Sequence, residues 1–318
     1  MRGDILVIDL LGGIGDLVML LPSIHALARR HPQANVRVLT HAPGSVLLTD
    51  DPAVAEVRTA EKGHERAAVV AELERLPYEL VVSTTRYDDI PAEIARRVPR
   101  SVTDLWRRPP PDELVSRRYL RILADEGLVD GPYEPPRIHL TEAERAAGVR
   151  RLADLVAGTA APVVVVPDAG MAVKVWPHRR GFAADMACRG IPVLVLGEDV
   201  PPVDLRGLAA FFAAVGLRGG VVVGPDTGPV RVAAAAGAGT VALFGPTVAG
   251  RYGLDPPSAD LQGLPGCPHR RPTAITEQVC WWEAACPLSE HGPACMADLT
   301  SARVVDAVLA LPGHRAAT

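Results

Sequence analysis

Short apolar runs alternate with amphipathic stretches along the first part of the chain. An apolar run bounded by turn residues predicts a buried strand, and apolar positions three or four residues apart predict a helix. The expected elements follow one another in order, with strands at 5–8, 36–39 and 80–83 and helices at 16–30, 66–76 and 112–126. This alternation is typical of a parallel sheet covered by helices.

The second part of the chain repeats this alternation. Its expected strands are 162–166, 191–196, 220–223 and 240–244, and its expected helices are 141–157, 179–189, 203–215, 229–236 and 301–311. Thr141 and Glu144 have the spacing of a capping box and should begin the first of these helices. Its strands lack polar alternation, as expected for strands buried on both faces. Residues 246–296 show no regular pattern and are expected to be irregular.

A stretch rich in proline and turn-forming residues, 129–140, separates the two parts. We therefore predict an α/β protein with two doubly wound domains, 1–135 and 136–318, the second ending in a helix at 300–311. Two such domains imply a cleft between them. Because ligands bind beyond the carboxyl ends of parallel strands, residues that directly follow strands are the candidates for function.

Composition narrows the class of protein. The 318 residues are 48% hydrophobic and 22% charged, which is typical of a soluble globular protein. The net charge of −4 argues against a nucleic-acid partner. No apolar run approaches the length of a transmembrane segment. Acidic residues at positions 4, 9 and 16 interrupt any signal-peptide pattern, so we expect a cytoplasmic location.

The first glycine-rich loop, 12–15, follows a strand and opens a helix at Asp16. As a dinucleotide fingerprint it lacks the third glycine, because Val18 stands there. Asp16 has two other interpretations. It could cap the helix, or it could take the proton from an acceptor hydroxyl as a general base.

Lys174 is one of only two lysines, Lys62 being the other, among 33 basic residues. It lies in a loop after a strand, where its ammonium could pair with a phosphate or lie free in solvent. Asp226, Thr227 and Gly228 stand between a strand and an alanine-rich helix. The amides of a helix start bind anions, although these residues could equally form a plain helix cap.

Together these motifs resemble glycosyltransferase family 9, the ADP-heptose heptosyltransferase family. The resemblance rests on 11–22, 174–177 and 223–229, with 233–236 and 243–247 after them. It implies the GT-B fold, with an N-terminal acceptor-binding and a C-terminal nucleotide-sugar-binding Rossmann-like domain. It also implies inverting transfer of a heptose or related sugar from an ADP-sugar to an acceptor hydroxyl. Catalysis would need no metal, and no D-x-D motif occurs in the chain.

The resemblance also implies roles for particular residues. Asp16 would be the base, and Lys174 would meet the donor diphosphate. The remaining donor-binding residues would be Gly15, Glu198, Asp226, Thr227 and Gly228. Glu198 would bind the ribose. The sequence departs from the family pattern at two places that bear on binding of the sugar and the acceptor. Asp9-Leu10-Leu11 stands where the family has a basic residue at the end of the first strand, and Arg231 stands where it has a histidine.

The acceptor could be a glycan or a small molecule. An arginine-rich composition is typical of high-GC bacteria such as actinomycetes, which lack lipopolysaccharide, so we expect an intermediate of antibiotic biosynthesis. Two other functions stay open at this point. The same scaffold could carry a sugar-nucleotide 2-epimerase or a non-catalytic nucleotide-binding protein.

Four of the five cysteines cluster near the C-terminus, at Cys267, Cys280, Cys286 and Cys295. Four thiolates could hold a structural zinc or iron ion, although their spacing is not that of a zinc ribbon. Free buried thiols and disulfides are the alternatives. Some family members, notably autotransporter heptosyltransferases, carry a four-cysteine iron site in this region, and the resemblance therefore favours a metal.

Overall fold

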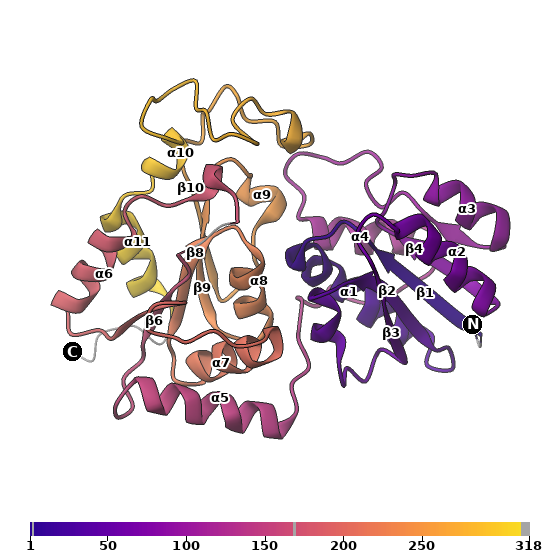
Figure 1. Cartoon of the computed structure of the whole chain (residues 1–318), viewed down its shortest axis with the longest axis horizontal. Coiled ribbons are helices and arrows are strands. Elements are labelled where there is room, and N and C mark those ends of the chain that lie inside the picture. Colours follow the sequence, from indigo (N-terminus) through magenta and orange to yellow (C-terminus); the bar gives the residue numbers. More distant parts are fainter. Residues whose placement is uncertain (2, 168–169, 313–318) are drawn as a thin grey trace. The chain divides into compact units, whose positions relative to one another are not determined.

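The computed structural model describes residues 1, 3–167 and 170–312. The chain divides into two compact units, coloured indigo to purple and pink to yellow in Figure 1. Unit 1 comprises Met1–Pro109 and Val115–Leu140, and unit 2 comprises Pro110–Leu114 and the described residues from Thr141 onward. The passage from one to the other at 140–141 lies close to the division after residue 135 expected from the sequence.

Unit 1 is built on a parallel sheet of order β3-β2-β1-β4-β5 within its described residues. The strands are β1 (Asp4–Asp9), β2 (Val36–His41), β3 (Glu56–Ala60), β4 (Tyr78–Ser83) and β5 (Ser101–Val102). The helices are α1 (Ile14–Arg30), α2 (Glu65–Arg75), α3 (Ile90–Arg97) and α4 (Val115–Asp125), with a 3-10 turn at Gly44–Leu48. α1 packs on α4, and α2 packs on α3 (Figure 1). Successive strands run outward in both directions from β1, so the topological switch point lies between β1 and β4.

Unit 2 has a parallel sheet of order β10-β9-β8-β6-β7 in the part that is described. The strands are β6 (Val163–Val165), β7 (Val193–Val195), β8 (Val221–Pro225), β9 (Gly239–Phe244) and β10 (Ser258–Gln262). Its switch point lies between β6 and β8.

The longer helices of unit 2 are α5 (Glu142–Leu155), α6 (Arg179–Cys188), α7 (Leu205–Leu217), α8 (Gly228–Ala235) and α11 (Ser301–Ala310). Single turns occur at η2 (Ala172–Lys174), α9 (Ala249–Tyr252), η3 (Ile275–Glu277) and α10 (Ala294–Ala297). α6 and α11 cover one face of the sheet, where Phe182, Met186 and Val304 join the core with Val165 and Val223 (Figure 1).

The predicted fold class is confirmed, and the capping box of Thr141 and Glu144 begins α5 as expected. One expectation was wrong: residues 246–296 are not wholly irregular, because β10 lies within them. β10 and β3 are edge strands with mixed polar and apolar residues, so neither shows the apolar run of a central strand. None of the described helices is long and apolar enough to cross a membrane.

The close packing of α5 on α7 depends on Gly148. A Cβ at this position would overlap the carbonyl group of Ala210 in α7. In an exposed helix the change from glycine to alanine is stabilising by about 1 kcal/mol. Here the overlap with backbone should dominate, because α7 cannot yield without moving its own hydrogen bonds.

We predict that Gly148→Ala lowers the free energy of unfolding by roughly 1–3 kcal/mol, as overpacked sites do. Gly181→Ala in α6 is the matched control, since a Cβ there would meet nothing within 4 Å. It should stabilise the protein by up to about 1 kcal/mol. Urea denaturation measures both changes, and a Gly148→Ala protein as stable as the original would contradict the close contact between α5 and the Ala210 carbonyl.

Candidate functional site

Lys174 and Asp226 meet at the switch point of unit 2. Lys174 lies in η2, after β6, and Asp226 directly follows β8. The Lys174 ammonium donates to the backbone carbonyl of Asp226 at 2.7 Å and lies 3.4 Å from its Oδ2. Only 14% of the Lys174 side chain is exposed. The structure therefore does not support the interpretation of Lys174 as a freely solvated lysine.

Arg231 completes a buried charge cluster with these two residues. Its guanidinium donates to Asp226 Oδ1 and to the backbone carbonyl of Tyr252. Burial by itself raises the pKa of Asp226, but the charges of Arg231 and Lys174 outweigh it and hold that pKa below its ordinary value. Among these three residues two cations face one carboxylate, which gives one net positive charge. The neighbouring Asp260, whose pKa burial raises to about 6, reduces this excess when it is ionised. Such a site favours an anionic ligand.

The start of α8 adds backbone dipoles beside this cluster. Thr227 is the residue before the helix and Gly228 is its first residue, as the sequence predicted. The Thr227 hydroxyl is buried and has no hydrogen-bond partner among the residues that the structure describes. It does not cap the helix, because its side chain accepts no bond from the first turn. The hydroxyl and the free amides of the first turn are therefore available to a ligand.

An apolar hollow of about 250 Å³ lies beside the start of α8. The ends of β6 and β7, the turn before α7 and Pro229 line it, with Val166, Leu196, Val203 and Leu208 supplying aliphatic surface. Glu198 lies in the turn after β7, where Arg179 donates to its Oε1 at 3.2 Å. The Glu198 side chain is 62% exposed, and it pairs with Arg179 and not with the charge cluster.

In unit 1 the glycine-rich loop joins β1 to α1. Gly12 has a φ of +92°, which favours glycine. The interpretation of Asp16 as the helix cap was wrong, because Gly13 is the residue before the helix and Asp16 lies within its first turn. The Asp16 carboxylate lies against Gly13, in space that any other side chain at position 13 would fill. Gly15 lies beside it in the same turn.

Asp9 is a second carboxyl group at this edge, and the analysis of the sequence gave it no role. It ends β1, is 1% exposed, and accepts a hydrogen bond of 2.6 Å from Thr84 Oγ1 beyond β4. Burial and the nearby charge of Asp16 raise the pKa of Asp9 to about 7. An aspartate within an otherwise apolar strand was the signal in the sequence. Asp9 and Asp16 thus form a carboxyl pair at the switch point of unit 1.

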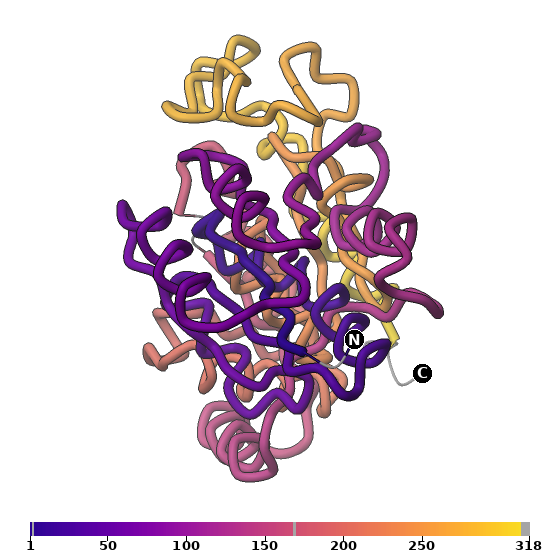
Figure 2. Tube along the Cα trace, turned by 90° about the vertical axis from the view of Figure 1, so that its right-hand side faces the viewer, coloured from indigo at the N-terminus to yellow at the C-terminus, as the bar shows by residue number. Residues whose placement is uncertain are grey.

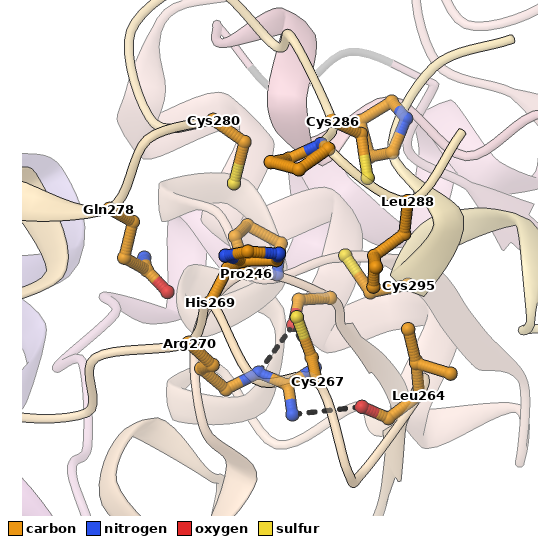
Figure 3. Close-up of a pocket in the computed structure, with 13 residues that line it drawn as sticks. Pro246, Leu264, Cys267, His269, Arg270, Gln278, Cys280, Cys286, Leu288 and Cys295 are labelled. Atoms are coloured by element: carbon orange, nitrogen blue, oxygen red, sulfur yellow. Dashed lines mark hydrogen bonds between the residues drawn. The ribbon is translucent and has the colours of Figure 1, made fainter. Parts of the chain in front are cut away.

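The four clustered cysteines line one small cavity in unit 2 (Figure 3). Their sulfur atoms turn toward the space between them, which has a volume of about 10 Å³. That volume holds about one water molecule or ion. Burial and the neighbouring thiols raise the pKa of Cys280, and burial raises that of Cys295 to about 11. All four cysteines are free thiols, which excludes the disulfide alternative for this structure.

The expectation of an assembled metal site is not met. No three histidine, cysteine, aspartate or glutamate side chains within 1, 3–167 and 170–312 are close enough together to hold a metal ion. The segment is nevertheless firmly attached to the sheet. The Arg270 guanidinium donates five hydrogen bonds to four backbone carbonyls, those of Gly245, Gly263, Leu264 and Pro265.

The comparisons with known proteins agree with this geometry. Residues 187–270, from α6 to the first part of the cysteine segment, match the family model of glycosyltransferase family 9 (heptosyltransferase). Over these residues the chain is similar to glycosyltransferase family 9. No curated protein sequence matches it significantly.

Solved structures of the family share the fold. A glycosyltransferase family 9 protein of Veillonella parvula is 14% identical, with a TM-score of 0.73, over 96% of this chain and 95% of that one. The ADP-heptose lps heptosyltransferase II of E. coli is 19% identical, with a TM-score of 0.69, over 96% and 98%. The iron-containing dodecameric glycosyltransferase TibC of E. coli H10407 is 16% identical, with a TM-score of 0.61, over 100% and 77%. The two parallel sheets of this chain thus match those of GT-B heptosyltransferase structures.

The pH dependence of stability tests the carboxyl pair. Because folding raises the pKa of Asp9 from 3.8 to about 7, its protonated form stabilises the fold, and this contribution is lost as the pH rises between those values. Asp9→Asn keeps an oxygen for Thr84 but cannot ionise. From pH 4 to pH 8 the stability of this variant should therefore improve relative to the original protein, by roughly 1–4 kcal/mol.

Chemical denaturation at a series of pH values measures this difference. Asp88→Asn is the control, because Asp88 is an exposed residue of the same unit and should show no such trend. Equal pH profiles for the original protein and Asp9→Asn would contradict the buried, proton-holding role of Asp9.

Proposed function

We propose that this protein is a glycosyltransferase that transfers a heptose or a related sugar from an ADP-sugar to an acceptor hydroxyl, with inversion and without a catalytic metal. The observation that carries the proposal is the buried cluster of Lys174, Asp226 and Arg231 at the switch point of unit 2. A site with excess positive charge and a helix start suits a diphosphate without a bridging cation.

The donor's parts correspond to neighbouring features of unit 2. The diphosphate would lie at Lys174 and the first turn of α8, where the Thr227 hydroxyl needs a partner. The adenine would occupy the apolar hollow that reaches Pro229. Glu198, in the turn after β7, would accept the ribose hydroxyls once it separates from Arg179. E. coli heptosyltransferase II, which shares the fold, is an ADP-heptose enzyme by name.

Asp16 would act as the general base. It takes the proton from the acceptor hydroxyl while the oxygen of that hydroxyl forms a bond to the anomeric carbon of the sugar. The bond from that carbon to the diphosphate breaks, and its electron pair leaves with ADP. Lys174 stabilises the charge that develops on the departing phosphate. A single displacement of this kind inverts the configuration of the sugar.

The burial of Asp9 beside Asp16 supports this role. Burial, together with repulsion by Asp16, raises the pKa of Asp9 to about 7, so that Asp9 is partly protonated near neutral pH and the pair carries less than two negative charges. For the acceptor we propose a small molecule, such as an antibiotic intermediate, in place of a lipopolysaccharide core. Location in the cytoplasm stays a prediction from the sequence.

Asp16→Asn tests the proposed reaction. The variant should bind ADP as the original protein does but transfer heptose from ADP-heptose at least about 100-fold more slowly, because a positioned base contributes 10²–10⁴-fold. Product formation with a panel of small-molecule acceptors and a lipid A core sugar measures the rate. Asp50→Asn, an exposed change in the same unit, is the control and should keep full activity.

Unchanged turnover of Asp16→Asn would show that Asp16 is not the general base. Transfer to the lipid A core sugar alone would refute the small-molecule acceptor. Epimerisation or hydrolysis of the sugar nucleotide without any transfer would point to a different reaction on this scaffold.

We also propose that the four clustered cysteines bind a zinc or iron ion that stabilises their segment. Thiolates are suitable ligands for either ion, and four thiols line one cavity and would release their protons on binding the metal. They are not close enough together in this structure to hold an ion, so binding would draw them closer. The ion would have a structural role and takes no part in sugar transfer. TibC, which shares the fold, is an iron-containing protein by name.

Metal analysis of the purified protein should find about one zinc or iron ion per chain, and Cys280→Ser with Cys286→Ser should abolish it and lower Tm by several degrees. Cys188→Ser is the control, because Cys188 is exposed and outside the segment. A metal-free protein whose Tm does not respond to added Zn²⁺ or Fe²⁺ would contradict the site.

A further inference from the structure

Trp281 joins the cysteine-bearing segment to the donor site. In unit 2 the chain between β10 and α10 is coil apart from η3, and it lies at one end of the sheet (Figures 1 and 2). Trp281 lies in this coil and is only 6% exposed. The centre of its ring lies 5.6 Å from the Lys174 ammonium. A cation at this distance is attracted to the electron-rich face of an indole.

The contacts of Lys174 with Asp226 leave one of its three ammonium hydrogens for a ligand. Asp226 holds the ammonium on one side through its carbonyl and its carboxylate, and the Trp281 ring adds a third neighbour. An ammonium has three hydrogens to donate, and Asp226 accounts for two acceptors. The long side chain of a lysine would otherwise sample many rotamers, and fixing it costs conformational entropy. Trp281 limits this freedom before the donor arrives.

The coil around Trp281 is itself fixed. The Trp281 amide donates to the carbonyl of Gln278, whose buried side chain accepts from the amide of Arg271 and donates to the carbonyl of Ile275. Cys280, the preceding residue, lines the cysteine cavity. The adjacent Trp282 is 73% exposed, and its indole N–H donates to the Thr276 carbonyl. Of the two neighbouring tryptophans, Trp281 is therefore buried and Trp282 is exposed to solvent.

We propose that Trp281 is a positioning residue that holds the Lys174 ammonium where it meets the donor diphosphate. This inference rests on the proposed function of Lys174. It makes the cysteine-bearing segment part of the donor site, although none of its residues need touch the nucleotide. Loss of the ring should weaken donor binding through Lys174 and through no other group.

A double-mutant cycle on the full-length protein, with ADP as the probe in calorimetric titrations, tests this inference. Trp281→Leu should weaken ADP binding about tenfold, and Trp281→Phe, which keeps an aromatic face, about threefold. Trp282→Leu is the matched control and should bind ADP as the original protein does. In a Lys174→Gln background, Trp281→Leu should cause no further loss, since coupled residues are not additive.

The outcomes separate the inference from the function on which it rests. Lys62→Gln is the control for loss of a lysine and should bind ADP normally. If Lys174→Gln binds ADP as well as this control does, the donor role of Lys174 fails. If Lys174→Gln weakens binding but Trp281→Leu does not, or if the two losses add, only the positioning role fails. Should Trp281→Leu fail to fold, Trp281→Phe in both backgrounds gives the same cycle, and equal losses in the two backgrounds would overturn the inference.

Discussion

The buried pairing of Lys174 with Asp226 is the interaction on which the proposed donor site depends. A buried ammonium is unfavourable unless it is paired, and Asp226 provides a carbonyl and a carboxylate for it. The pairing exists because β6 and β8 are neighbours in the sheet although β7 separates them in sequence. The fold thus brings the loops after β6 and β8 together at the edge of the sheet where the parallel strands have their carboxyl ends. Arg231, one turn into α8, then adds a second cation to this pair.

The switch points of the two units carry side chains of different charge. At the switch point of unit 2 the groups are cationic, and at the switch point of unit 1 they are carboxyl groups, Asp9 and Asp16. A cationic site suits a departing diphosphate, and a carboxylate suits a hydroxyl that must lose its proton. The family pattern has a basic residue at the end of the first strand, where this chain has Asp9, a buried carboxyl group beside the proposed base Asp16.

The sequence predicted the parts of this protein that local patterns determine. Central strands are buried on both faces and appear as apolar runs, and the capping box at Thr141 marks the start of α5. The loops that carry Asp16, Lys174 and Asp226 were found because each directly follows a strand. Edge strands such as β10 were missed, since a half-exposed strand needs no apolar run. The contact of Trp281 with Lys174 joins residues over 100 positions apart, and no local pattern encodes it. The pKa of Asp9 likewise depends on burial by the whole unit.

An experimental structure of the protein with ADP tests the central claim most directly. The account predicts a diphosphate oxygen within hydrogen-bond distance of the Lys174 ammonium, with the other phosphate oxygens at the first turn of α8 and the adenine in the hollow beside Pro229. A nucleotide bound at the glycine-rich loop of unit 1, with Lys174 still held only by Asp226, would contradict it.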